Sequence, residues 1–133
     1  MLFRSDNLGV VIGGFFGEAG RILRKTAARR PDPQGSTIIG SRMKTSPEMA
    51  AMVNAATMRY VEFNDVYHWP GSYQGHPSDM ITPILAAAEH AGASGRDYIT
   101  AVVLAYEIYA RLCDVFPRNN RRSEEHTSEL QSH

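Results

Sequence analysis

The chain has 133 residues, a length that is typical of one domain. Its 14 basic and 14 acidic side chains cancel, so we expect no electrostatic footprint for nucleic acid or for an anionic membrane surface. No stretch is long and apolar enough to cross a bilayer, and the short glycine-rich run from Leu8 to Phe16 lacks a convincing signal-peptide cleavage pattern. We therefore expect a soluble, cytoplasmic protein.

The single cysteine, Cys113, cannot form an internal disulfide and indicates a reducing compartment. It lies in the apolar run from Ile108 to Phe116. A cysteine in such a run usually behaves as a small hydrophobic residue, so we expect Cys113 to be buried rather than to act as a nucleophile.

The two ends of the chain are unlike the rest. Residues 122–133, RSEEHTSELQSH, are polar and show no helical stripe, which alone would indicate a disordered tail. This string resembles the conceptual translation of a widely used short-read sequencing adapter, and LFRS at residues 2–5 resembles the end of the partner adapter. We therefore set residues 1–5 and 122–133 apart and expect residues 6–121 to be a natural but partial domain.

The first half of this region predicts two helices and a strand. The apolar run from Leu8 to Ile12 indicates the end of a helix that Gly13 and Gly14 stop. Residues 18–30 predict an amphipathic helix whose last turns are basic and which ends before Pro31. Its expected apolar stripe consists of Ala19, Ile22, Leu23 and Ala27. The β-branched residues 36–40, STIIG, predict a small strand.

A third helix is predicted to begin at Ser46 as N-cap with Pro47 at its first position. Its expected apolar stripe is Met49, Met52, Val53, Ala56, Tyr60 and Phe63. Residues 64–77 contain prolines and glycines and predict a loop.

Two further helices follow the loop. Ser78 or Asp79 is expected to cap the first of them, which should end at Gly92. Ser94 and Asp97 resemble the capping box of the last helix. That helix is apolar nearly all round, which predicts burial on most sides. The predicted class is thus all-α, a fragment of a helical domain with one short β element.

Titratable and hydrogen-bonding side chains are concentrated around the loop. They are Glu62, Asn64, Asp65, Tyr67, His68, Trp69, Tyr73, His76, Ser78 and Asp79. Carboxylate and imidazole groups together can remove a proton next to a carboxylate and protonate a leaving hydroxyl. The N-terminus of the following helix would suit an anionic substrate.

Simpler interpretations apply to the same residues. Asp65 could only cap the loop, His68 and His76 could be ordinary surface histidines, and Glu62 could be a solvated helix end. A metal site would need His68 and His76 with Asp65 or Glu62, but no tight ligand spacing supports one, so we expect no metal.

Several motifs, in this order, resemble the MmgE/PrpD family. They are DNLGV from Asp6, SPEMAAMVNA from Ser46, RYVEFNDVY from Arg59, GHPSDM from Gly75 and SGRDYITAVVLAYEI from Ser94. The resemblance implies a large helical domain, a smaller α/β lid domain and a homodimer. It also implies a lyase that acts on small di- or tricarboxylates without metal or organic cofactor.

The resemblance also assigns roles to individual residues. The family's acidic motif usually reads DFNDT or DFDDT and here reads EFNDV, which places Glu62 and Asp65 at the two acids and Val66 at the threonine. The family's site histidine falls on His76. The resemblance thus implies catalytic roles for His76, Asp65 and Glu62. Side chains expected to bind substrate are Ser78, Asn64 and His68.

The expected function is dehydration of a 2-methylcitrate-like hydroxy acid by the parent enzyme, with the fragment itself inactive. Decarboxylation of a cis-aconitate-like acid is an alternative that shares the same carboxylate recognition. A helical module that binds a partner through its apolar last helix is the non-enzymatic alternative, although it leaves the acid–histidine loop unexplained.

Overall fold

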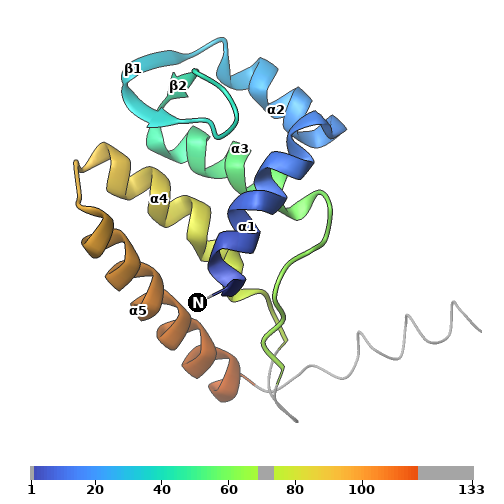
Figure 1. The fold of residues 1–133 in the computed structure, drawn as a ribbon, viewed down its shortest axis with the longest axis vertical. Coiled ribbons are helices and arrows are strands. Elements are labelled where there is room, and N and C mark those ends of the chain that lie inside the picture. The colour runs from blue at the N-terminus through green and yellow to red at the C-terminus, as the bar shows by residue number, and fades with distance from the viewer. Residues whose placement is uncertain (1, 69–73, 117–133) are drawn as a thin grey trace, which may run out of the picture.

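A computed structural model describes residues 2–68 and 74–116, as five α-helices and one two-stranded sheet (Figure 1). The helices are α1 (Leu2–Gly13), α2 (Glu18–Ala27), α3 (Pro47–Arg59), α4 (Ile81–His90) and α5 (Gly95–Val115). Two 3-10 helices, η1 (Gly14–Phe16) and η2 (Pro77–Met80), precede α2 and α4, and β1 (Pro31–Thr37) pairs antiparallel with β2 (Lys44–Thr45). The predicted mostly α-helical class is confirmed.

Helix α3 lies at the centre and contacts α1, α2 and α4. The predicted stripe is wrong for Met52, Tyr60 and Phe63, which are exposed. The buried face of α3 consists of Ala50, Val53, Asn54, Thr57 and Met58. Small and polar residues face inward because neighbouring backbones approach closely, as a Cβ built on Gly14 would lie only 2.1 Å from the Thr57 carbonyl oxygen.

The strand lies earlier than predicted, and only Ser36 and Thr37 of the expected run belong to it. The backbone that follows is held by a side chain. Asn54 of α3 accepts a hydrogen bond from the Ile39 amide and donates one to the Thr37 carbonyl, each 3.0 Å long. The Asn54 side chain thus pairs the Ile39 amide and the Thr37 carbonyl, which a partner strand would otherwise pair. Ile38, between them, is buried without being part of the sheet.

Most predicted helix ends are confirmed. The Ser46 side chain accepts from the Met49 amide, and Ser94 and Asp97 form the reciprocal capping box. Gly92 has a φ of 63°, and α4 ends with bonds from Gly92 to Glu89 and from the next amide to Ala88. The predicted cap of α4 is wrong, because η2 intervenes and the residue before α4, Met80, makes no side-chain cap.

Helix α5 packs on α4 and η2 along one edge of the molecule (Figure 1). Val102 and Cys113 are buried, as expected for the cysteine, and burial raises the pKa of the Cys113 thiol. The other face of α5 exposes Ile99, Val103, Leu104, Ile108, Leu112 and Val115. Among the described helices, none combines the length and apolar character that a membrane span requires.

Candidate functional site

Two described segments of the loop between α3 and η2, residues 64–68 and 74–76, are joined by an antiparallel bridge, and we call them together the arm. Tyr67 and Gly75 form a two-way backbone bridge, with the Tyr67 amide 2.8 Å from the Gly75 carbonyl and the reverse bond at 3.4 Å. The bridge brings the segment around Asp65 beside the segment from His76 to Ser78. It explains how groups eleven to thirteen residues apart share one site.

His76 is held in a defined orientation at the base of this arm. Its Nδ1 lies 2.6 Å from the backbone carbonyl oxygen of Asp65. A carbonyl oxygen can only accept, so Nδ1 carries the proton, and in the neutral ring Nε2 then carries a free lone pair. No hydrogen bond from the described residues reaches Nε2. The half-buried imidazole is therefore in the tautomer that can accept a proton at Nε2.

Asp65 holds the same junction a second time through its side chain. Its Oδ1 accepts a hydrogen bond of 3.0 Å from the Ser78 amide in the first turn of η2. The carboxylate thus fixes the loop to η2 while the carbonyl of the same residue fixes the imidazole. Asp65 therefore contacts both the His76 ring and η2.

A layer of buried polar side chains lies beneath the histidine. Asn64 donates to Ser78 Oγ at 3.4 Å and to Asn7 Oδ1 of α1 at 3.3 Å. Ser78 is fully buried and Asn7 nearly so. Asn64 Oδ1 is also buried but has no hydrogen-bond partner among the described residues. The layer joins α1, the loop and η2 and supports the segment that carries His76.

A carboxylate and a guanidinium flank this layer. Arg59 at the end of α3 lies 3.7 Å from Asp79 of η2, and both side chains are about one-third exposed. Burial raises the pKa of Asp79, and the nearby Asp65 adds to this, while Arg59 and His76 act in the opposite direction. Asp79 therefore holds its proton more tightly than a solvent-exposed aspartate.

Two predicted site residues lie apart from this cluster. Glu62 is exposed, with a φ of 54° that is uncommon for a residue with a side chain. Its backbone amide donates to the Arg59 carbonyl at 3.2 Å, but its side chain makes no hydrogen bond or ion pair with the other described site residues. His68 is exposed on the arm and bonds to Gln74 through Nδ1. Trp69 and Tyr73 lie outside the described residues. The structure thus brings Asn64, Asp65, His76 and Ser78 together but not Glu62 or His68.

Two of these neighbours, Asn7 and Arg59, were not predicted as site residues. Asn7 falls within the motif DNLGV, where a polar residue interrupts an apolar helix, and Arg59 opens the motif RYVEFNDVY. Sequence pattern alone could not relate Asn7 to Asn64, 57 positions away. Among residues 2–68 and 74–116, no three His, Cys, Asp or Glu side chains lie close enough to hold a metal ion.

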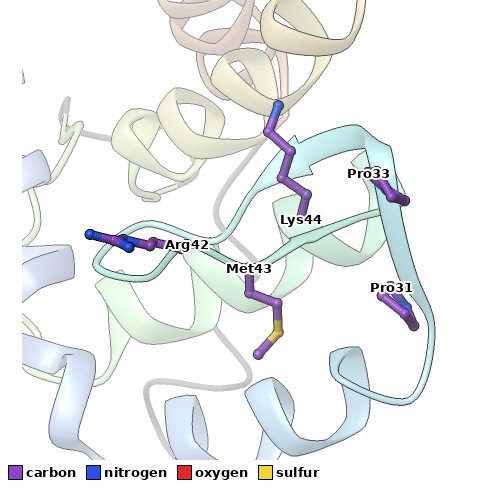
Figure 2. Close-up of a pocket in the computed structure, with 5 residues that line it drawn as sticks. All are labelled: Pro31, Pro33, Arg42, Met43 and Lys44. Atoms are coloured by element: carbon purple, nitrogen blue, oxygen red, sulfur yellow. The ribbon is translucent and has the colours of Figure 1, made fainter.

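An open hollow of about 410 Å³ lies elsewhere, beside the sheet. Figure 2 shows the residues that line it, which are Pro31, Pro33, Arg42, Met43 and Lys44. The Lys44 ammonium extends toward α4, where it pairs with Glu89 at 2.9 Å. None of the predicted site residues lines this hollow, so we do not assign the chemistry to it.

The chain is similar to known proteins of one family. The family model of the MmgE/PrpD N-terminal domain matches residues 2–131. The chain belongs to the MmgE/PrpD family. The resemblance drawn from the sequence motifs is therefore confirmed.

Relatives in this family are named as dehydratases. The chain is 35% identical to the 2-methylcitrate dehydratase of Escherichia coli K12 over 86 residues, which is 57% of this chain and 17% of that protein. It is 28% identical over 117 residues to the probable 2-methylcitrate dehydratase of Saccharomyces cerevisiae, which is 77% of this chain and 22% of that protein. The chain thus spans about a fifth of the length of these relatives. No solved structure gives a significant match.

Proposed function

We propose that the protein to which this chain belongs dehydrates a 2-methylcitrate-like hydroxy-tricarboxylate, with His76 as the base. The bond of 2.6 Å between His76 Nδ1 and the Asp65 carbonyl carries the proposal, because it leaves Nε2 free to accept a proton. Membership of the MmgE/PrpD family and the names of the relatives support the substrate class.

In the proposed reaction, Nε2 removes a proton from the carbon next to a substrate carboxylate. The electron pair of the broken C–H bond forms the carbon–carbon double bond. The hydroxyl group on the neighbouring carbon leaves as water after it takes up the proton from the imidazolium, which returns the ring to its neutral form. The imidazolium that forms keeps its Nδ1–H bond to the Asp65 carbonyl, so the fixed carbonyl dipole stabilises the charge that develops.

The remaining residues have supporting roles in this proposal. Asp65 positions His76, and His68 contacts a substrate carboxylate from the loop. Asn64 donates to Ser78 and Asn7, so its Oδ1, which has no partner among the described residues, accepts a hydrogen bond from the substrate hydroxyl. Ser78 lies fully buried beneath them, so its hydroxyl acts on the substrate through Asn64. Glu62, exposed at the start of the loop, orients the substrate from the rim. The reaction needs no cofactor, and we propose that the full-length protein is a homodimer.

The test is turnover of the full-length protein with a panel of hydroxy-tricarboxylates. His76→Gln should lower kcat by about 10² to 10⁴, the usual contribution of a general base. The matched control is His90→Gln, because His90 is an exposed histidine at the end of α4, away from the loop. Turnover of His76→Gln at the wild-type rate would remove His76 from the mechanism.

A further inference from the structure

The arm that carries His76 is fastened to the end of α5 at two points. The Tyr67 hydroxyl donates a hydrogen bond of 2.8 Å to Asp114 Oδ1 in the last turn of α5. Five residues earlier on the same helix, the hydroxyl of Tyr109 lies against Gly75, where a Cβ would be only 1.9 Å away. Tyr67 and Gly75 are the two residues of the backbone bridge, so α5 holds both sides of it.

Tyr67 and Gly75 have no role in the proposed reaction itself. Tyr67 uses its backbone for the bridge and its side chain for α5, while Gly75 directly precedes His76. A displacement of the bridge would therefore move the imidazole relative to the Asp65 carbonyl that fixes its tautomer. The chain of contacts runs from Asp114 through Tyr67 and Gly75 to His76.

Helix stability does not explain the placement of Asp114. A carboxylate in the last turn of a helix faces the negative end of the helix dipole, which is unfavourable. The exposed Asp114 instead accepts a charge-assisted hydrogen bond from a group outside its own helix. That bond also raises the pKa of Tyr67, as expected for a phenol that donates to a carboxylate.

We infer that Tyr67 and Asp114 are positioning residues for His76, a pair that holds the loop bridge against α5. The pair acts through the orientation of the imidazole and does not touch the substrate. This inference rests on the proposed function for its catalytic consequence, but its structural part can be measured without any activity.

The first measurement uses NMR on the chain itself. Tyr67→Phe removes only the donating hydroxyl and keeps the ring. We expect amide exchange at Tyr67 and Gly75 to become about tenfold faster, as for loss of one charge-assisted bond, and the His76 imidazole to shift from the Nδ1–H form toward the mixture of tautomers of a free ring. Unchanged exchange and an unchanged tautomer would overturn the inference.

Two comparisons separate the hydrogen bond from other effects. Asp114→Asn keeps an acceptor oxygen and should largely preserve the wild-type behaviour, whereas Asp114→Leu should resemble Tyr67→Phe. Equal loss in both Asp114 variants would refute the hydrogen-bond basis. Thr100→Ala is the control, because it removes the bond of 3.0 Å from the Thr100 hydroxyl to the Arg96 carbonyl on the same helix, fourteen residues before Asp114, and it should leave both signals unchanged.

The second measurement uses turnover of the full-length protein. Tyr67→Phe should lower kcat by about tenfold with little change in KM, since positioning affects the chemical step more than substrate binding. If wild-type protein shows no dehydration but the NMR changes occur, the proposed function fails and the positioning pair stands. If wild-type protein is active and Tyr67→Phe matches it in both measurements, the positioning pair fails and the proposed function stands.

Discussion

Replacement of Gly75 by alanine would place a methyl group inside the contact between the loop and α5. The new Cβ would lie 1.9 Å from the Tyr109 hydroxyl oxygen, 2.9 Å from Cζ and 3.2 Å from Cε1 of the same ring. Ordinary contacts between such atoms begin near 3.5 Å, so the oxygen would have to retreat by about 1.5 Å. Either the Tyr109 ring or the bridge at Gly75 must move.

The loss in the free energy of unfolding depends on whether the Tyr109 ring or the bridge at Gly75 can move. Overpacking of this kind costs about 1–3 kcal/mol when neighbours cannot relax freely. Tyr109 is half-buried on α5 and Gly75 is held to Tyr67 by the bridge, so neither side is free. We expect Gly75→Ala to lower the free energy of unfolding by about 2 kcal/mol, within that range. It should also move the adjacent His76.

The assay is urea unfolding of a double-mutant cycle. Tyr109→Phe removes the oxygen that is 1.9 Å from the new methyl and leaves ring atoms at 2.9 Å and beyond. It should therefore recover part of the loss in the Gly75→Ala background, with a coupling energy of about 1 kcal/mol. The control is Gly9→Ala in α1, where nothing lies within 4 Å of the added methyl. That change should stabilise the chain by about 0.5–1 kcal/mol, because alanine favours the helix more than glycine does.

Two results would refute this reasoning. Gly75→Ala could unfold within about 0.5 kcal/mol of wild type, the range typical of neutral surface changes. Alternatively, the cycle could show no coupling with Tyr109→Phe, in which case the loss would come from the backbone of Gly75 and not from its contact with α5.

Three further predictions concern charge and burial. The native state holds the Asp79 proton more tightly than the unfolded chain does, so the free energy of unfolding should fall as the pH rises through the raised pKa. Asp79→Asn should abolish this fall, which urea unfolding from pH 3 to 7 measures. Burial alone would raise the pKa of Glu89, but the bonds from Thr37 and Lys44 outweigh burial and lower that pKa, so the free energy of unfolding should fall as the pH drops through the pKa. Glu89→Gln should remove this loss at acid pH, and it should cost about 1 kcal/mol of stability at pH 7. On α5, Val102→Ala should cost about 1–2 kcal/mol and Val103→Ala less than about 0.5 kcal/mol in thermal unfolding, because the first side chain is 2% exposed and the second 48%.

The helix ends could be predicted because their chemistry is local. Ser46 followed by proline, and Ser94 with Asp97, satisfy free backbone amides within three residues of the cap. Gly92 supplies the left-handed conformation that ends α4. The predicted cap of α4 failed because η2 precedes the helix and the Ser78 hydroxyl accepts from Asn64, fourteen residues earlier, which no local rule includes.

The buried face of α3 could not be predicted from periodicity. The apolar count favoured the side with Met52 and Tyr60, yet the inward side carries Asn54 and Thr57. That choice depends on the close approach of Gly14 and on the backbone groups near Ile39 that need the Asn54 amide. Both are tertiary facts that the helical pattern of α3 does not contain.

The sequence predicted the residues that cluster around His76, but it also included two residues that lie apart from this cluster. Asp65, His76 and Ser78 follow one another within one loop, so a single turn of the chain brings them together. Glu62 and His68 are as close in sequence, but the positive φ at Glu62 and the arm beyond Asp65 keep both exposed.

Several unsatisfied polar groups and one uncommon backbone conformation occur near this junction, while Arg24 Nη1 of α2 is a similar group elsewhere. Asn64 Oδ1 and Thr82 Oγ1 are buried without a hydrogen-bond partner among the described residues, and Asp79 Oδ1 has only the longer ion pair to Arg59. Each such group costs stability, so native chains keep few of them away from sites that use them. With the uncommon φ at Glu62, these costs fall within 21 residues of sequence around His76. Polar groups of this kind can be satisfied by a bound ligand, which agrees with the proposed substrate contact of Asn64 Oδ1.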